Sequence, residues 1–188
     1  PEGEPAVWII VLNPGDPEKE LPTWAHAVTG GGPAVLLAPR GVGQARWTRK
    51  NPPNTVERSL ALLGQTADGG RVYDTLVAAR RIKRVLGAKT VKLAGRGPAG
   101  VIAAYAAAYE PEVAEVVAVD PPPSHAPTRE GAAIGPASLN ALRGLDVPDA
   151  FGLLAPRRVT LIGADKAAFR RTAEIYERAG ASGALDIR

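Results

Sequence analysis

Residues 90–100 read TVKLAGRGPAG, a short apolar run followed at once by a turn of small residues. The run Thr90–Ala94 is too short for a typical helix, and its β-branched residues favour a buried strand. The turn Gly95–Gly97 leads into Pro98–Tyr109, which is rich in alanine and begins with proline, a residue common in the first turn of helices. The stretch therefore predicts a strand, a tight turn and a buried helix.

The same alternation extends over most of the chain. Further strands are expected over Val7–Leu12, Pro33–Ala38, Val116–Val119 and Arg158–Ile162, with a sixth over Ala184–Ile187. Helical spacing of apolar residues predicts helices over Gly70–Leu86 and Asp165–Ala179, and another is expected around Ala137–Arg143. Short buried strands that alternate with helices indicate an α/β fold. We expect one domain over residues 1–188, with a mostly parallel sheet of about five or six strands and helices on both faces.

Composition excludes several classes of protein. The 188 residues are 45% hydrophobic, with 23 basic and 19 acidic side chains and a net charge of +4. The absence of cysteine excludes disulfides and thiolate sites, and the two histidines are too few for a histidine-rich metal site. No apolar run approaches the length of a membrane span. We therefore expect no metal, no cofactor and no membrane partner.

The densest basic run has a structural interpretation. Arg80, Arg81, Lys83 and Arg84 lie in the last turns of the expected helix 70–86, where positive charge complements the helix dipole, and Gly87 is placed to cap it. Nucleic-acid binding is the alternative, but no aromatic residues interleave with the charges. We expect a solvated helix end and no nucleic-acid partner.

The turn after Ala94 has the frame of a nucleophile elbow. In the pattern G-x-S-x-G, a strand ends in a sharp turn that presents a serine before the next helix. Gly95–Ala99 fits this frame with a small residue in its last position, and the serine position is occupied by Gly97. Glycine adopts the strained elbow backbone at little cost but cannot attack a carbonyl.

A glycine-rich phosphate loop is the competing interpretation of the same turn. Gly95, Gly97 and Gly100 match G-x-G-x-x-G between a strand and a helix. The acidic residue expected about 20 residues later would be Glu115 or Asp120. However, the motif follows the third expected strand, whereas dinucleotide-binding folds carry it after the first.

In order and spacing, the chain from Trp8 to Gly180 resembles the α/β-hydrolase superfamily, in its acetyl xylan esterase, dienelactone hydrolase and prolyl-oligopeptidase-like branch. Ala38–Gly43 resembles the branch's D-x-R-G-x-G segment, with Ala38 where Asp usually stands. Arg71–Asp74 resembles the helix before the elbow strand. Asp146–Arg157 resembles the A-P-R-P lead-in to the strand that bears the catalytic acid.

The resemblance implies a Ser-His-acid site, and this chain departs from it. Gly97 stands at the nucleophile position, and Asn13–Asp16 replaces the His-Gly segment that supplies the oxyanion hole. The family's first two strands have no counterpart, and its histidine follows the strand that here closes the chain at Arg188. Only Asp165 stands at a catalytic position, that of the acid, and it could equally cap a helix beginning at Lys166.

Other polar residues receive structural interpretations. Ser124–His125 is the only adjacent Ser/His pair, but sequence neighbours rarely face each other in a triad, so we expect this pair to fix a loop. His26 is expected to be a packing or surface residue on a short helix, and the three tryptophans to pack in the core or at its rim. The candidate cleft residues are Asn13, Arg96, Pro98, Ser124 and His125.

Two functional hypotheses follow. The first is a non-catalytic α/β-hydrolase domain that serves a longer esterase-like protein as a structural or ligand-binding module. The second is part of an active serine hydrolase, an acyl or carbohydrate esterase, whose Ser and His lie elsewhere. The start at Pro1 and the absence of methionine favour a segment of a longer polypeptide. The expected partner is another domain or a second subunit, which would cover an exposed sheet edge at Val7–Leu12 or near Leu185.

Overall fold

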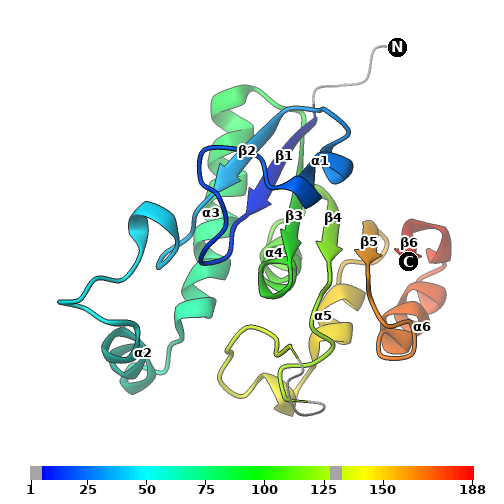
Figure 1. The fold of residues 1–188 in the computed structure, drawn as a ribbon. Helices are drawn as coiled ribbons and strands as arrows, with labels where there is room; N and C mark the ends of the chain where they lie inside the picture. The colour runs from blue at the N-terminus through cyan, green and yellow to red at the C-terminus, as the bar shows by residue number, and fades with distance from the viewer. Residues whose placement is uncertain (1–5, 128–132) are drawn as a thin grey trace.

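The computed structural model describes residues 6–127 and 133–188. Within this part of the chain, six strands form one sheet in the order β2-β1-β3-β4-β5-β6, and every neighbouring pair is parallel (Figure 1). The strands are β1 (Ala6–Val11), β2 (Ala34–Leu37), β3 (Thr90–Arg96), β4 (Val113–Val119), β5 (Arg158–Ile162) and β6 (Leu185–Ile187). The prediction of a parallel sheet of about six strands is confirmed.

Helices cover both faces of the sheet, as predicted. They are α1 (Thr23–Thr29), α2 (Pro53–Leu62), α3 (Ala67–Leu86), α4 (Pro98–Tyr109), α5 (Val147–Gly152) and α6 (Arg170–Arg178). Short 3-10 turns occupy Gly43–Ala45, Ala141–Arg143 and Ser182–Ala184. Two apolar clusters hold these layers together: residues of α3 to α6 pack with one face of the sheet, and residues of α1 pack with the other. No helix of the described residues is both long enough and apolar enough to cross a bilayer.

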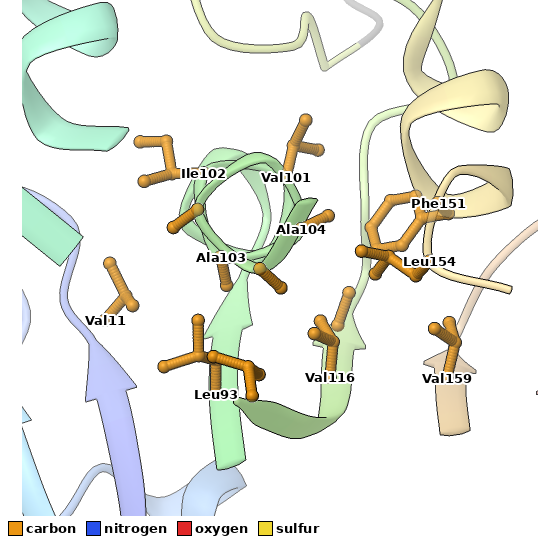
Figure 2. Close-up of a cluster of buried hydrophobic side chains, with 14 of the residues drawn as sticks. Val11, Leu93, Val101, Ile102, Ala103, Ala104, Val116, Phe151, Leu154 and Val159 are labelled. Atoms are coloured by element: carbon orange, nitrogen blue, oxygen red, sulfur yellow. The ribbon is translucent and has the colours of Figure 1, made fainter. Parts of the chain in front are cut away.

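The larger cluster is built around α4. This helix is apolar on nearly all sides, as expected of a buried helix, and Figure 2 shows it lying over β3 and β4 with Ala103 directed at the sheet. Leu93 and Val116 meet it from the strands, and Phe151 of α5 packs beside it. Small side chains along α4 allow its backbone to approach the strands closely.

The basic end of α3 is a capped helix terminus, as expected. Gly87 adopts a left-handed conformation, and its N–H donates to the carbonyl of Lys83. Arg80 forms an ion pair with Glu110, and Lys83 forms one with Glu112 at 2.7 Å. Part of the positive charge is therefore matched by acidic residues around the end of α4.

Two helix predictions are wrong in extent. The predicted helix 165–179 begins only at Arg170, because the side chain of Asp165 accepts the N–H of Ala167 at 2.9 Å and forms a separate turn. Asp165 therefore does not cap α6. The predicted helix 137–143 is only a 3-10 turn, since Asn140 before it adopts φ 61°, a conformation that helices exclude.

Two helices and one sheet edge lie outside the predictions. The sequence analysis did not predict α2 or α5, both of which carry proline in their first turn. The predicted exposed edge at Val7–Leu12 is wrong, because β1 lies between β2 and β3 and an edge of the sheet is formed by β2. The other edge is β6, near Leu185 as expected.

Candidate functional site

The order of the strands creates a crevice at the ends of β1 and β3. From β1 the chain passes to β2 on one side, whereas β3 pairs with the other side of β1. The loops that follow β1 and β3 therefore diverge, and ligands of open α/β sheets bind at such switch points. Asn13 follows β1, and its side-chain amide donates to the carbonyl of Arg96 at 2.9 Å. Two candidate cleft residues are thus brought together at this crevice.

The turn after β3 has the backbone expected of an elbow, with glycine at its apex. Gly97 has φ 55° and ψ −131°, and its N–H donates to the carbonyl of Val119 at 2.8 Å. Its carbonyl accepts the N–H of Gly100 at 3.1 Å as α4 begins. A Cβ at Gly97 would meet no atom within 4 Å. The position is sterically open to a side chain, and glycine relieves the strain of its positive φ.

Gly95 and Gly100 are glycine for a different reason, which is close packing. A Cβ at Gly95 would lie 2.4 Å from the carbonyl carbon of Ala99, and one at Gly100 would lie 2.8 Å from the Cβ of Ala118. Both residues must therefore be glycine so that α4 can approach β3 and β4. Close packing thus accounts for two glycines of the G-x-G-x-x-G pattern without a phosphate ligand.

The side chain of Arg96 is directed to Asp120 rather than to a substrate site. The two form an ion pair at 3.0 Å between Nε and Oδ2, with both side chains about half exposed. Asp120 itself has φ 47°, and its N–H donates to the carbonyl of Ile162 at 2.7 Å. The pair links the turns that follow β3 and β4.

The turn after β1 offers few amides for an oxyanion. The N–H of Asn13 donates to Oδ2 of Asp16 at 2.7 Å, and Pro14 has no N–H. A working oxyanion hole needs free donors aimed at the developing charge. Two of the backbone positions that could supply such donors are therefore engaged or lack a proton.

A cavity of about 290 Å³ opens beside this turn. Its lining residues are Leu12, Asn13, Pro14, Val42, Asp68, Arg71, Pro98, Ile102, Ile134, Gly135, Pro136 and Ala137. It includes Asn13 and Pro98 of the predicted cleft residues. Arg71 donates to Oδ1 of Asp68 at 2.7 Å, so the two charges in the lining compensate each other. Asp68 and Ile134 were not predicted from the sequence, because they reach the crevice only through tertiary contacts.

Two segments quoted for the family resemblance meet next to this cavity. Arg40 makes a bidentate pair with Asp74 of α3, at 2.9 Å from Nε and 2.7 Å from Nη2, and its own N–H donates to the same carboxylate. Burial alone would raise the pKa of Asp74, but the hydrogen bonds from Arg40 outweigh burial and hold this pKa below its usual range. The pair anchors the loop after β2 to α3.

Ser124 and His125 do not form a catalytic pair. The hydroxyl of Ser124 donates to Oδ2 of Asp146 at 2.6 Å, and the N–H of His125 donates to Oδ1 of the same residue at 2.7 Å. Burial would raise the pKa of Asp146, but these hydrogen bonds, with one from Val147, lower it. The prediction that Ser124 and His125 fix a loop agrees with this network.

Both nitrogens of the His125 ring have partners. Nδ1 lies 2.8 Å from the carbonyl of Pro136, which can only accept, so the neutral ring carries its proton there. Nε2, 2.7 Å from the hydroxyl of Tyr105, then accepts from it. Burial raises the pKa of Tyr105 to about 12, with Asp146 and Asp149 adding to the effect, so this hydroxyl stays protonated.

Asp165 and His26 are both exposed. Asp165 follows β5, which β4 separates from β3 in the sheet, and its side chain accepts the N–H of Ala167. His26 is exposed on α1. In residues 6–127 and 133–188, no cluster of three or more His, Cys, Asp or Glu side chains could hold a metal ion.

The tryptophans lie in or beside the core. Trp8 is buried on β1, with the ammonium of Lys92 5.1 Å from its ring, and Trp24 packs against the cluster beneath α1. Trp47 covers Gly41, where a Cβ would be only 2.6 Å from the ring. None of them lines the cavity beside the elbow.

Comparisons with known proteins find similarity in solved structures. No protein-family model matches the chain, and a search of curated proteins finds no significant relative. Among solved structures, a candidate acetyl xylan esterase from Bacteroides fragilis is 18% identical with a TM-score of 0.65, over 98% of this chain and 58% of that one.

Two further structures show the same likeness. The acylaminoacyl peptidase of Pyrococcus horikoshii is 13% identical with a TM-score of 0.62, over 100% of this chain and 32% of that one. A lipase-esterase related protein from Clostridium acetobutylicum is 13% identical with a TM-score of 0.59, over 98% of this chain and 85% of that one. At these identities the likeness concerns the fold, and it agrees with the strand order and elbow geometry described above. The chain has the α/β-hydrolase fold.

Proposed function

We propose that this chain is a non-catalytic α/β-hydrolase domain that serves a longer esterase-like protein as a structural or ligand-binding module. The observation that carries the proposal is Gly97. The elbow backbone is intact, but the residue at its apex has no side chain and cannot form an acyl-enzyme. The turn and its packing are formed without the nucleophile, which supports a role that does not require it.

The hydrogen bonds of the other candidate residues support the same proposal. The N–H of Asn13 is bonded to Asp16, and both ring nitrogens of His125 are engaged. Asp165 bonds a nearby backbone amide rather than a histidine. A general base, an acid that orients it and a free pair of oxyanion donors are the parts that acyl transfer needs. These residues are committed to other contacts.

The direct test is ester turnover by the chain as it stands. We expect p-nitrophenyl acetate to be hydrolysed no faster than in buffer, and a fluorophosphonate probe to leave the protein unlabelled. Because small esters react with many surface groups, the informative result is inhibition. Turnover that a serine-directed inhibitor abolishes would overturn the proposal.

Restoring the serine alone should not restore activity. In Gly97→Ser the new Cβ meets nothing within 4 Å, so the variant should fold, with the free energy of unfolding lowered by about 1 kcal/mol through backbone strain. Because both ring nitrogens of His125 are engaged and His26 is exposed on α1, we expect no gain in ester hydrolysis over Gly97→Ala, which carries the same strain. Fast turnover by Gly97→Ser would mean that the remaining machinery is present, and would contradict the proposal.

A second candidate is part of an active serine hydrolase, an acyl or carbohydrate esterase, whose Ser and His lie outside this chain. The length of similar proteins favours this second candidate, because the chain spans only 58% of the candidate acetyl xylan esterase and 32% of the peptidase. The edge strand β2 supports it too, since its outer side could accept a further strand from another domain or subunit.

The natural polypeptide decides between the two candidates. Its intact mass and terminal sequences are the measurement. A longer chain with a serine elbow and a histidine in another part would support the second candidate. A longer chain without them, or a natural product with these termini, would leave a non-catalytic domain.

A further inference from the structure

A second cavity lies away from the elbow, between α3, α4 and the segment after β4. Its volume is about 360 Å³, within the range of small-molecule sites. The residues that line it are Asp68, Gly69, Val72, Tyr105, Tyr109, Pro136, Ala137, Ser138, Asn140, Ala141, Gly144 and Leu145. Most of these contribute apolar atoms. Neither Gly97 nor Asp165 takes part.

The wall between this cavity and the cleft is fixed by hydrogen bonds. The N–H of Ala137 donates to Oδ2 of Asp68 at 2.7 Å, the carbonyl of Pro136 accepts from His125 at 2.8 Å, and the N–H of Gly135 donates to the carbonyl of Ser124 at 2.7 Å. Hydrogen bonds to two separate parts of the chain, α3 and the Ser124–His125 pair, hold this segment. The cavity is therefore largely preformed, which lowers the cost of ordering on binding.

The lining favours a ring compound. Tyr105 and Tyr109 lie four residues apart on α4 and so face the same side of the helix. The ring of Tyr105 is held by stacking on His125, with the ring centroids 5.7 Å apart. Tyr109 is 68% exposed, so much of its side chain is accessible to a ligand. Aromatic side chains provide offset-stacking or edge contacts to a planar ligand.

The polar side of the lining selects for a hydrogen-bond donor. Asp68 is the one charged residue among those that line the cavity. Its Oδ1 accepts from Arg71 and its Oδ2 accepts from Ala137, and a carboxylate has about four acceptor sites. Acceptor capacity therefore remains for a ligand hydroxyl, whereas a ligand carboxylate has no proton to donate to it.

We propose that this cavity binds a small neutral ring compound that carries a hydroxyl group, with the ring against Tyr105 and Tyr109 and the hydroxyl donating to Asp68. This site is independent of the elbow and of any ester hydrolysis.

Binding of phenol, followed by NMR, is the test. We expect phenol to shift signals of Tyr105, Tyr109 and Ser138, and to bind at least about tenfold more tightly than benzoate, a ring of similar size whose carboxylate has no proton to donate to Asp68. In Ala141→Trp the added side chain should fill the cavity and weaken phenol binding by about tenfold or more. Leu142→Trp is the matched control, because Leu142 is 56% exposed and does not line the cavity.

The proposal is overturned if phenol fails to bind, if it binds equally well to Ala141→Trp, or if benzoate binds as tightly as phenol. A circular dichroism spectrum and a thermal transition identify a variant that has not folded. Because the readout is binding, the result is distinct from that of the ester assay: either proposal can fail while the other stands.

Discussion

Replacing Gly95 by alanine is expected to lower the free energy of unfolding by about 3 kcal/mol, at the upper end of what overpacking costs. The added Cβ would lie 2.4 Å from the carbonyl carbon and 2.5 Å from the oxygen of Ala99, and 2.6 Å from the nitrogen of Gly100. These are backbone atoms of α4, so no side-chain rotation can make room. The helix must shift on β3, and the packing of the main apolar cluster shifts with it.

Urea denaturation monitored by circular dichroism measures this effect, and Gly97→Ala is the matched control. Both variants add one methyl group to the same turn, but the Cβ at Gly97 meets no atom within 4 Å. The control should therefore lose only about 1 kcal/mol through backbone strain. Equal losses in the two variants would show that close approach of α4 to β3 is not the reason for Gly95.

Replacing Asp146 by alanine is the second large effect, with an expected loss of about 3 kcal/mol. Its carboxylate accepts from the hydroxyl of Ser124 and from the N–H groups of His125 and Val147. Removal leaves these donors without a partner, and Ser124 is buried. An unsatisfied buried donor costs about 1–3 kcal/mol, and loss of a helix N-cap about 1 kcal/mol.

Asp146→Asn separates hydrogen bonding from charge, because it keeps one acceptor oxygen and should lose roughly half as much stability. The pH adds a further check. The folded-state pKa of Asp146 is lowered, so its carboxylate stabilises the fold above the unfolded pKa of about 4, and this contribution is lost as the pH falls further. The difference in stability between wild type and Asp146→Ala should therefore narrow below about pH 4. A difference that stays constant down to pH 2 would contradict this account.

Local patterns were sufficient for most of the fold. The apolar runs predicted the six strands, and Pro98–Tyr109 was predicted with the bounds that α4 has. The errors lie where a side chain or an unusual backbone angle overrides periodicity. Asp165 bonds the amide of Ala167 and delays α6, and Asn140 in the left-handed region prevents a helix over 137–143.

The candidate site was less accessible to prediction. That Gly97 occupies the serine position of an elbow follows from neighbouring residues alone. That Asn13 bonds Arg96, 83 positions later, depends on the pairing of β1 with β3. Asp68 lines both cavities, and its carboxylate accepts the N–H of Ala137, 69 positions away. No local sequence pattern predicts such a contact.

The amino-acid order alone therefore predicts the succession of strands and helices and the tight glycine turn after β3, because strand and helix periods and the identity of a few residues are local properties. The tertiary structure alone decides that β2 rather than β1 forms a sheet edge, and that Asp146 rather than His125 takes the hydrogen bond of Ser124. It also decides that two cavities meet at the segment 135–137. Each of these depends on which distant segments the sheet order brings together, and packing of the whole chain sets that order.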